Sequence, residues 1–168
     1  MKLIIIITGT PGTGKTKISG ELAKLLNKKT GGKFKVLHLN AAILRHKLWS
    51  SIDRKRKSKN ADMKKLRKFV SEQIKKNPNL VIESHLAHYF KGDVVFVLRT
   101  GIKELKRRME KRGWSEQKIE ENLEVERLNL ILGESLDMHG EKCVEINTTK
   151  KAPKWIAEEM LRLTTLGY

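Results

Sequence analysis

Short apolar runs alternate along the chain with segments in which apolar residues recur every three or four positions. The runs are rich in β-branched residues and lie at 3–7, 80–83, 94–98 and 143–146, and the more mixed segment 34–39 has a similar length. Uninterrupted runs are typical of strands buried on both faces of a parallel sheet. Helical spacing is found around 18–26, 41–49, 61–76, 101–111, 115–136 and after 153. Five buried strands alternating with helices predict an α/β fold with a five-stranded, doubly wound parallel sheet flanked by helices.

The overall composition fits one folded domain over residues 1–168. The chain has 168 residues, of which 39% are hydrophobic, and it shows no internal repeat or linker. The apolar run Leu3–Ile7 is too short for a membrane span or a signal peptide, so no membrane association is expected. The single cysteine, Cys143, excludes an intrachain disulfide and favours a reducing, cytoplasmic setting.

The positive charge is concentrated in the first half of the chain. The net charge is +17, and residues 1–76 carry 21 basic and 4 acidic residues, whereas residues 77–168 carry 15 of each. The densest segment, 45–76, has 13 basic and 3 acidic residues and includes the run Arg54–Lys57. This concentration favours contact with a polyanion such as RNA. The alternative is a solvated, lysine-rich surface of the kind found in heat-stable proteins.

One motif points directly to chemistry. Gly9–Thr16 reads GTPGTGKT and fits G-x-x-x-x-G-K-[ST] between a predicted strand and a predicted helix. Glycines let such a loop turn its backbone N–H groups toward phosphate oxygens, and the helix adds its positive end. We expect Lys15 to contact the β- and γ-phosphates and the Thr16 hydroxyl to bind Mg²⁺. The remaining loop residues expected at the phosphates are Thr10, Gly12, Thr13 and Gly14.

An acidic residue ends the third predicted strand, Leu80–Glu83. Glu83 is expected near Mg²⁺ or an attacking water, although a strand-end glutamate can also simply meet solvent. If the chain stays extended, His85 lies on the same side as Glu83, because side chains alternate along a strand. His85 could then orient a water or contact the γ-phosphate, and the alternative is a structural histidine.

Two further segments offer weaker signals. Arg108 and Arg112 lie four residues apart, so both project from one helix face and could neutralise a transferring phosphoryl group. A solvated basic helix end explains them equally well. The loop 147–153 follows the last strand, at the same end of the sheet as the glycine-rich loop. Its backbone could contact a base, or it could be a capping turn in which Thr149 and Lys151 have no ligand role.

In this order these elements resemble the adenylate kinase family of P-loop nucleoside monophosphate kinases, and the resemblance spans nearly the whole chain. It is closest to the isoenzyme-6-like branch, also called coilin-interacting nuclear ATPase. The residues that carry it are Gly9–Thr16, Glu83-Ser84-His85, Val97-Leu98-Arg99-Thr100, and Arg112-Gly113-Trp114-Ser115 with Asn122. That branch has an Asp-x-His motif, which Glu83 and His85 match with a longer carboxylate arm. A lid helix pair of the family resembles 115–134.

The resemblance implies a role for each matching residue. Lys15 and Thr16 would hold phosphate and Mg²⁺, Arg108 would lie near the ATP adenine, Arg112 would be the lid arginine on the phosphates, and 147–153 would hold the adenine. Lys15, Glu83, His85 and Arg112 would form the catalytic set.

The acceptor side is also implied by resemblance. Arg45, with Asn40 in the same segment, would bind the acceptor monophosphate within a basic segment at about 40–76, and 112–136 would form a lid. The usual Gly-Asp of the acceptor segment is replaced by Ala41 and Ala42.

The resemblance implies a reaction and partners. The reaction would be ATP + AMP to two ADP with Mg²⁺, together with ATPase activity. The partners would be a small-subunit ribosomal protein and rRNA, contacted through 45–76 during ribosome maturation. Two alternatives stay open: a ribosome-assembly ATPase switch with little kinase activity, and a small-metabolite kinase of the same fold, such as a nucleoside or shikimate-type kinase.

Overall fold

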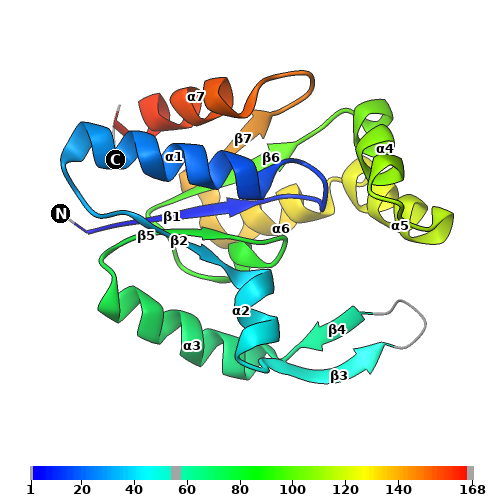
Figure 1. Ribbon diagram of the computed structural model, residues 1–168, viewed down its shortest axis with the longest axis horizontal. Helices are drawn as coiled ribbons and strands as arrows, with labels where there is room; N and C mark the ends of the chain where they lie inside the picture. Colours follow the sequence, from blue (N-terminus) through cyan, green and yellow to red (C-terminus); the bar gives the residue numbers. More distant parts are fainter. Residues whose placement is uncertain (1, 54–57, 166–168) are drawn as a thin grey trace.

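A five-stranded parallel sheet forms the centre of the protein. The computed structural model describes residues 2–53 and 58–165 (Figure 1). The sheet has the strand order β2-β5-β1-β6-β7, and every neighbouring pair is parallel. Its strands are β1 (Leu3–Thr8), β2 (Lys35–His38), β5 (Asn79–Glu83), β6 (Val94–Arg99) and β7 (Cys143–Asn147). The predicted five-stranded α/β sheet is confirmed.

Helices cover both faces of this sheet, which is why the strands read as nearly continuous apolar runs. On one face lie α1 (Lys15–Thr30) and α7 (Pro153–Thr165), which pack against each other (Figure 1). On the other face lie α3 (Met63–Lys76), α6 (Leu130–His139) and the short helix η1 (Ala87–Tyr89). The isoleucines of β1 alternate between the two apolar clusters, with Ile5 and Ile7 in one and Ile4 and Ile6 in the other.

The segment after β2 differs from the predicted helix over 41–49. Helix α2 (Leu39–Arg45) ends early, because Lys47 adopts a left-handed backbone with φ 52°. Leu48 then turns inward, and Trp49 opens an antiparallel hairpin of β3 (Trp49–Asp53) and β4 (Ser58–Ala61). The basic run 54–57 lies outside the described residues.

The predicted long helix over 115–136 is also wrong, because it is two helices. Ser115 caps α5 (Glu116–Arg127) as predicted, by accepting the N–H of Lys118 at 3.4 Å. The helix then stops, since Asn129 has a left-handed backbone with φ 54°, and α6 begins in a new direction. Helix α5 packs on α4 (Ile102–Lys111) through a separate small apolar cluster. The short helix η2 (Gly140–Lys142) leads into β7.

No helix within 2–53 or 58–165 combines the length and the apolar character that crossing a bilayer requires.

Candidate active site

The glycine-rich loop lies where β1 ends and α1 begins, at the carboxyl end of the central strand. Gly9, Gly12 and Gly14 have φ values of 135°, 99° and 97°, a region that L side chains rarely adopt. A Cβ on Gly9 would also lie 2.3 Å from the backbone oxygen of Leu98 on β6. The sequence therefore needs glycine here both for backbone conformation and for close packing against β6.

The side chain of Lys15 folds back onto the glycine-rich loop. Its ammonium donates to the backbone oxygens of Gly9 at 2.8 Å and Thr10 at 3.0 Å, and the residue is only 8% exposed. Burial lowers the pKa of Lys15 from 10.5 to about 8, and the nearby carboxylate of Glu83 opposes this shift. A partly desolvated cation in a glycine-rich loop of this kind is well suited to bind a phosphate.

Glu83 lies beside Thr16, as the sequence predicted. Register brings it there, because Glu83 pairs with Ile7 of β1 on one side and with His38 of β2 on the other. The Thr16 hydroxyl donates to the Glu83 carboxylate at 3.3 Å, and His38 Nδ1 lies 2.7 Å from the same oxygen. Glu83 is 5% exposed, so these two neighbours and solvent at the loop set its orientation. His38 was not singled out from the sequence.

The oxygens of Thr16 and Glu83 suit Mg²⁺, a hard cation that prefers oxygen ligands. Among the described residues no group of three or more His, Cys, Asp or Glu side chains could hold a metal. Two protein oxygens fit a magnesium ion that takes its other ligands from nucleotide phosphates and water, which is how Mg²⁺ is usually bound.

The chain does not stay extended as far as His85, so the condition for placing His85 on the same side as Glu83 is not met. Strand β5 stops at Glu83, and Ser84 turns the chain, with its N–H bonded to the oxygen of Ile7 at 3.2 Å. His85 nevertheless lies near the glycine-rich loop. The charge of Lys15 is close enough to affect the pKa of His85. Burial first, and then the positive charges of Lys15 and His88, lower the pKa of His85 from 6.5 to about 4. At neutral pH it is therefore an uncharged imidazole.

The two predicted acceptor residues differ in their surroundings. The side-chain oxygen of Asn40 on α2 accepts the Ser84 hydroxyl at 2.9 Å, which places it next to Glu83 and His85. Arg45 is exposed at the end of α2. No ion pair joins its guanidinium to another residue of the described part of the chain.

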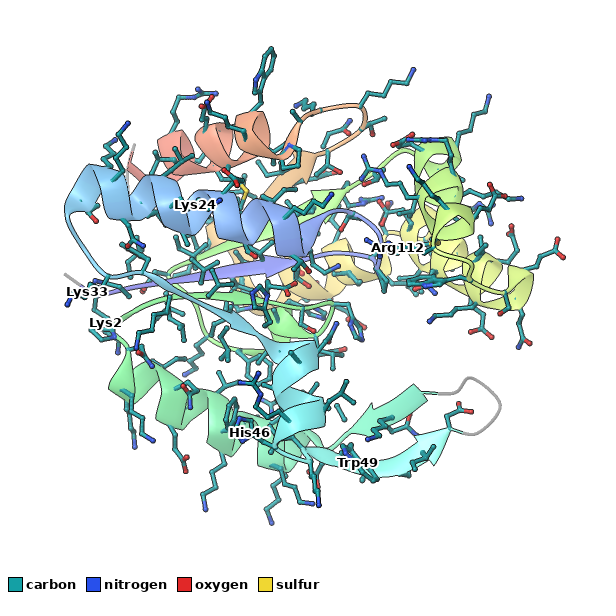
Figure 2. The ribbon with its side chains drawn as sticks, in the orientation of Figure 1. Lys2, Lys24, Lys33, His46, Trp49 and Arg112 are labelled. Atoms are coloured by element: carbon teal, nitrogen blue, oxygen red, sulfur yellow. The ribbon has the colours of Figure 1, made fainter. Side chains whose placement is uncertain are left out.

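The two predicted arginines lie on the opposite side of the loop, at the end of α4. Arg108 is held by Glu104 at 2.9 Å and reaches the backbone oxygens of Gly12 and Thr148 at 3.4 Å each. It therefore bridges the glycine-rich loop and the loop after β7. Arg112 is exposed and lies beside the β1–α1 connection in the view of Figure 2. Its positive charge is close enough to Lys15 to lower the pKa of Lys15.

The loop 147–153 is brought to the site through Thr148, a residue that the sequence did not mark. The Thr148 hydroxyl is bonded to the Thr13 oxygen at 3.2 Å, to the Thr100 hydroxyl at 2.7 Å and to the Arg99 oxygen at 3.0 Å. Thr149 uses its hydroxyl to accept the N–H of Gly101. The ammonium of Lys151 points instead to α7, where it pairs with Glu159 at 3.4 Å.

Two other residues near the loop were missed by the sequence. Glu126 of α5 is 4% exposed, and its carboxylate accepts the hydroxyl of Thr10. His88 is buried between the Thr8 hydroxyl at 3.0 Å and Glu134 of α6 at 2.9 Å. For Glu126 the sequence offers one indication of burial: it lies three residues after Leu123, on the apolar face of α5. For His88 the sequence offers only its closeness to Glu83 along the chain.

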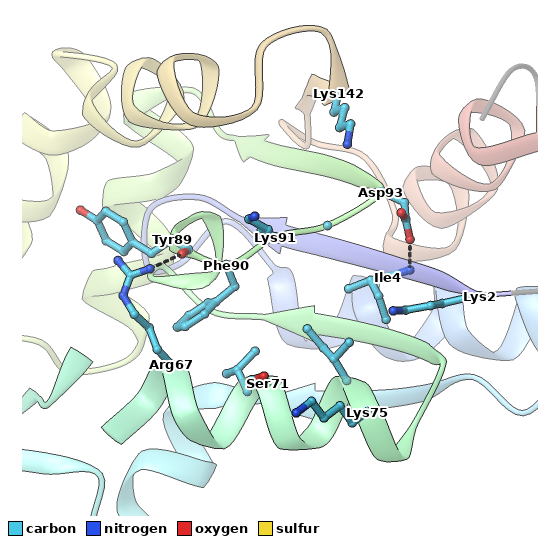
Figure 3. A pocket seen from close by; sticks show the side chains of 13 residues that line it. Lys2, Ile4, Arg67, Ser71, Lys75, Tyr89, Phe90, Lys91, Asp93 and Lys142 are labelled. Carbon is cyan, nitrogen blue, oxygen red and sulfur yellow. Dashed lines mark hydrogen bonds between the residues drawn. The ribbon is translucent and has the colours of Figure 1, made fainter. Parts of the chain in front are cut away.

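A cavity of about 610 Å³ lies away from this site (Figure 3). It is bounded by α3 on one side and by the start of β1 and the segment 89–93 on the other. Arg67, Lys75, Lys91 and Lys2 surround an apolar floor that includes Phe90. No residue of the glycine-rich loop lines it, so the loop geometry, and not cavity size, locates the candidate active site.

Known proteins are similar to this chain over most of its length. A family model described as an AAA domain matches residues 5–129. A protein of Methanosarcina acetivorans described as "Putative adenylate kinase" is 42% identical over 167 residues, covering 96% of this chain and 86% of that protein. One of the same description from Thermococcus kodakarensis is 36% identical over 165 residues, covering 98% and 87%.

Solved structures support the fold. Shikimate kinase from Acinetobacter baumannii in complex with shikimate has a TM-score of 0.69 at 16% identity, covering 99% of this chain and 94% of that one. Deoxyadenosine kinase from M. mycoides with bound dATP has a TM-score of 0.61 at 18% identity, covering 97% and 99%. The fold and the glycine-rich loop together define a P-loop kinase-type protein that binds nucleotides. The chain belongs to the adenylate kinase-like family of its sequence relatives.

Proposed function

We propose that the protein is an adenylate kinase that catalyses ATP + AMP to two ADP and also hydrolyses ATP, with Mg²⁺ as cofactor. The observation that carries the proposal is the convergence of Lys15, Thr16 and Glu83 at one end of the sheet. Its relatives described as "Putative adenylate kinase" support the choice of AMP as acceptor.

In the proposed reaction a phosphate oxygen of AMP attacks the γ-phosphorus of ATP, and the bond from that phosphorus to the β–γ bridging oxygen breaks. Two ADP molecules result, and no protein nucleophile is needed. Such transfer depends on positioning and on neutralising negative charge. Lys15 would neutralise the β- and γ-phosphates, and Arg108 and Arg112 would approach from α4. Thr16 and Glu83 would hold Mg²⁺, which would supply positive charge against the phosphates when bound.

The acceptor would lie on the α2 side of Glu83. Asn40 is next to Ser84, and Arg45 at the end of the same helix has a guanidinium suited to a monophosphate. We assign acceptor binding to the segment 40–76 and lid closure to 112–136. For the adenine we assign Arg108 and the loop with Thr149, whereas Lys151 would have to leave Glu159 to take part.

His85 fits the proposed ATPase activity. The uncharged imidazole of His85, near Lys15, can accept a hydrogen bond from a water molecule, and Glu83 would orient the same water. Because the pKa of His85 is about 4, its hydrogen-bonding role would be constant across neutral pH.

A panel assay tests the proposal. The purified protein is incubated with Mg²⁺ and ATP and with AMP, CMP, UMP, GMP, adenosine or shikimate, and ADP is measured by a coupled assay. We expect the largest rate with AMP, a slow rate without acceptor, and loss of most turnover in Lys15→Ala. Preference for shikimate or a nucleoside would replace the adenylate kinase assignment with a small-metabolite kinase. An unchanged rate in Lys15→Ala would refute the site itself.

The basic segment 45–76 favours a second proposed role, in small ribosomal subunit maturation in the cytoplasm, as in the isoenzyme-6-like branch. Its described lysines and arginines on α3 are exposed, including Lys64, Lys65, Arg67 and Lys68. Neutralising RNA phosphates would make affinity fall steeply with salt. We expect labelled rRNA fragments to bind at low salt and to be released at high salt. Absence of binding at low salt would remove this role.

A further inference from the structure

A buried carboxylate connects helix α5 to the second residue of the glycine-rich loop. Glu126 lies one residue before the end of α5 and is 4% exposed. One of its carboxylate oxygens accepts the hydroxyl of Thr10, which is itself 1% exposed. The other accepts Arg99 Nε at 2.7 Å and the N–H of Thr100 at 3.1 Å. Three donors from two separate elements therefore fix this side chain.

The charge of Glu126 is already balanced inside the cluster. Arg99 donates through Nε to the carboxylate, and its terminal nitrogen donates to the Glu126 backbone oxygen at 3.0 Å and to the Asn129 side chain at 2.6 Å. The buried carboxylate of Glu126 therefore has a charged partner and is not an isolated charge inside the protein. The bond to Thr10 is thus an addition to a satisfied pair, and its value lies in where it holds Thr10.

Thr10 occupies a central position in the loop. Its backbone oxygen accepts the Lys15 ammonium at 3.0 Å and the Thr13 hydroxyl at 2.9 Å. Its hydroxyl is the atom that Glu126 holds. A change in the backbone of Thr10 would move the oxygen that accepts the Lys15 ammonium. Hence the carboxylate on α5 influences the phosphate-binding lysine through one intervening residue.

We propose that Glu126 is a positioning residue for ATP binding, which fixes the glycine-rich loop through Thr10 and couples its shape to α5. The inference rests on the proposed nucleotide site and adds a residue to it. The carboxylate of Glu126 is occupied by Thr10, Arg99 and Thr100. Its effect passes through the Thr10 hydroxyl, so removing that hydroxyl and withdrawing the carboxylate should have the same consequence.

Two variants remove the link without changing any charge. Thr10→Val keeps the side-chain shape but has no donor, and Glu126→Asp keeps the carboxylate but shortens its arm by one methylene. Because the net charge is constant, long-range attraction for the triphosphate is unchanged. Thr10→Ser restores the donor. Glu120→Asp makes the same chemical change as Glu126→Asp on the same helix, at a site whose partners are Lys106 and Arg127.

The experiment measures ATP binding by calorimetry, KM for ATP and for AMP, and thermal stability. We expect Thr10→Val and Glu126→Asp each to raise the ATP dissociation constant about tenfold, as expected for one lost bond to a charged group. The KM for AMP should stay within about twofold, and Thr10→Ser, which keeps the donor, should lose less ATP affinity than Thr10→Val. Glu120→Asp should resemble wild type. The ATP dissociation constant of the double variant should be no higher than that of the single variant that binds ATP more weakly, because both substitutions remove the same link.

The outcomes separate this inference from the proposed function. If the wild type does not bind ATP, the proposed nucleotide site fails. If the wild type binds ATP and both single variants bind it equally well while melting at lower temperature, Glu126 is only structural and the inference is overturned. Additive effects in the double variant would also overturn it, since they would mean two independent routes to the loop.

Discussion

Replacing Lys15 by methionine should make the protein more stable at neutral pH while removing its ability to bind ATP. The ammonium is buried at the loop, and burial lowers its pKa from 10.5 to about 8. Since each pKa unit corresponds to about 1.4 kcal/mol, holding this charge inside the fold at pH 7 costs about 3 kcal/mol. Methionine has a similar length and no charge, but it leaves the oxygens of Gly9 and Thr10 without their donor, at about 1–2 kcal/mol. The net gain is about 1–2 kcal/mol.

The sign of this difference depends on pH. The folded-state pKa of Lys15 lies below its unfolded value, so between about pH 8 and 10.5 the unfolded chain binds the extra proton. The free energy of unfolding of the wild type therefore rises with pH in this window relative to Lys15→Met. The two stabilities should cross, and the variant should become the less stable protein near pH 10.5.

Urea unfolding at pH 7 and at pH 10 measures the effect, and the comparison between the proteins cancels the titration of all other groups. Lys17→Met is the matched control, because Lys17 is exposed on the same helix. We expect the control to show no crossing. A Lys15→Met protein that is less stable than wild type at pH 7, or a difference that is constant with pH, would refute the burial argument.

Three further changes test other parts of the site. Gly9→Ala should lower the free energy of unfolding by more than about 3 kcal/mol, because φ is 135° and the new Cβ would lie 2.3 Å from the Leu98 oxygen. Chemical denaturation measures this loss, and a value below about 1 kcal/mol would contradict the prediction. Glu83→Gln should lower the Mg²⁺-dependent kcat by about a hundredfold, measured by the coupled assay. ATP binding without metal, measured by calorimetry, should change little. A kcat equal to that of the wild type would show that Glu83 does not belong to the metal site. Lys150→Gly should raise stability by up to about 1 kcal/mol, because Lys150 is exposed with φ 54°; a lower melting temperature would show that its side chain is needed.

The sheet and the centre of the site could be predicted because their signals are local. Leu3–Thr8 is nearly all β-branched, and the motif after it has a required geometry, so a strand, a nest and a helix follow. Glu83 came to Thr16 because the carboxyl ends of parallel strands meet at one edge. Such inferences need only the period of the pattern and the rule for adjacent strands.

The remaining features depend on contacts that no local pattern shows. The segment after Arg45 has the apolar content of a helix, and only the left-handed backbone at Lys47 redirects it into a hairpin. At Asn129 the same device breaks the predicted long helix, supported by the bond from Arg99. Glu126 resembles any helical glutamate until the fold places Thr10 against it, 116 residues earlier in the chain.

The strand order also affects how the chain folds as it is made. β1 is the most apolar strand, yet both of its neighbours come much later, since Leu3 pairs with Asn79 and Ile5 with Val94. At about 5–20 residues per second, roughly 4–15 s of synthesis separate the first strand from its first partner. During that interval Ile4–Ile7 has no sheet to enter, and uncharged β-branched segments of this kind are prone to pair with other chains. The lysines and arginines that are dense in the first half of the chain give other copies of the nascent chain the same charge. We therefore expect this charge to disfavour pairing of β1 between chains before its partner strands are made.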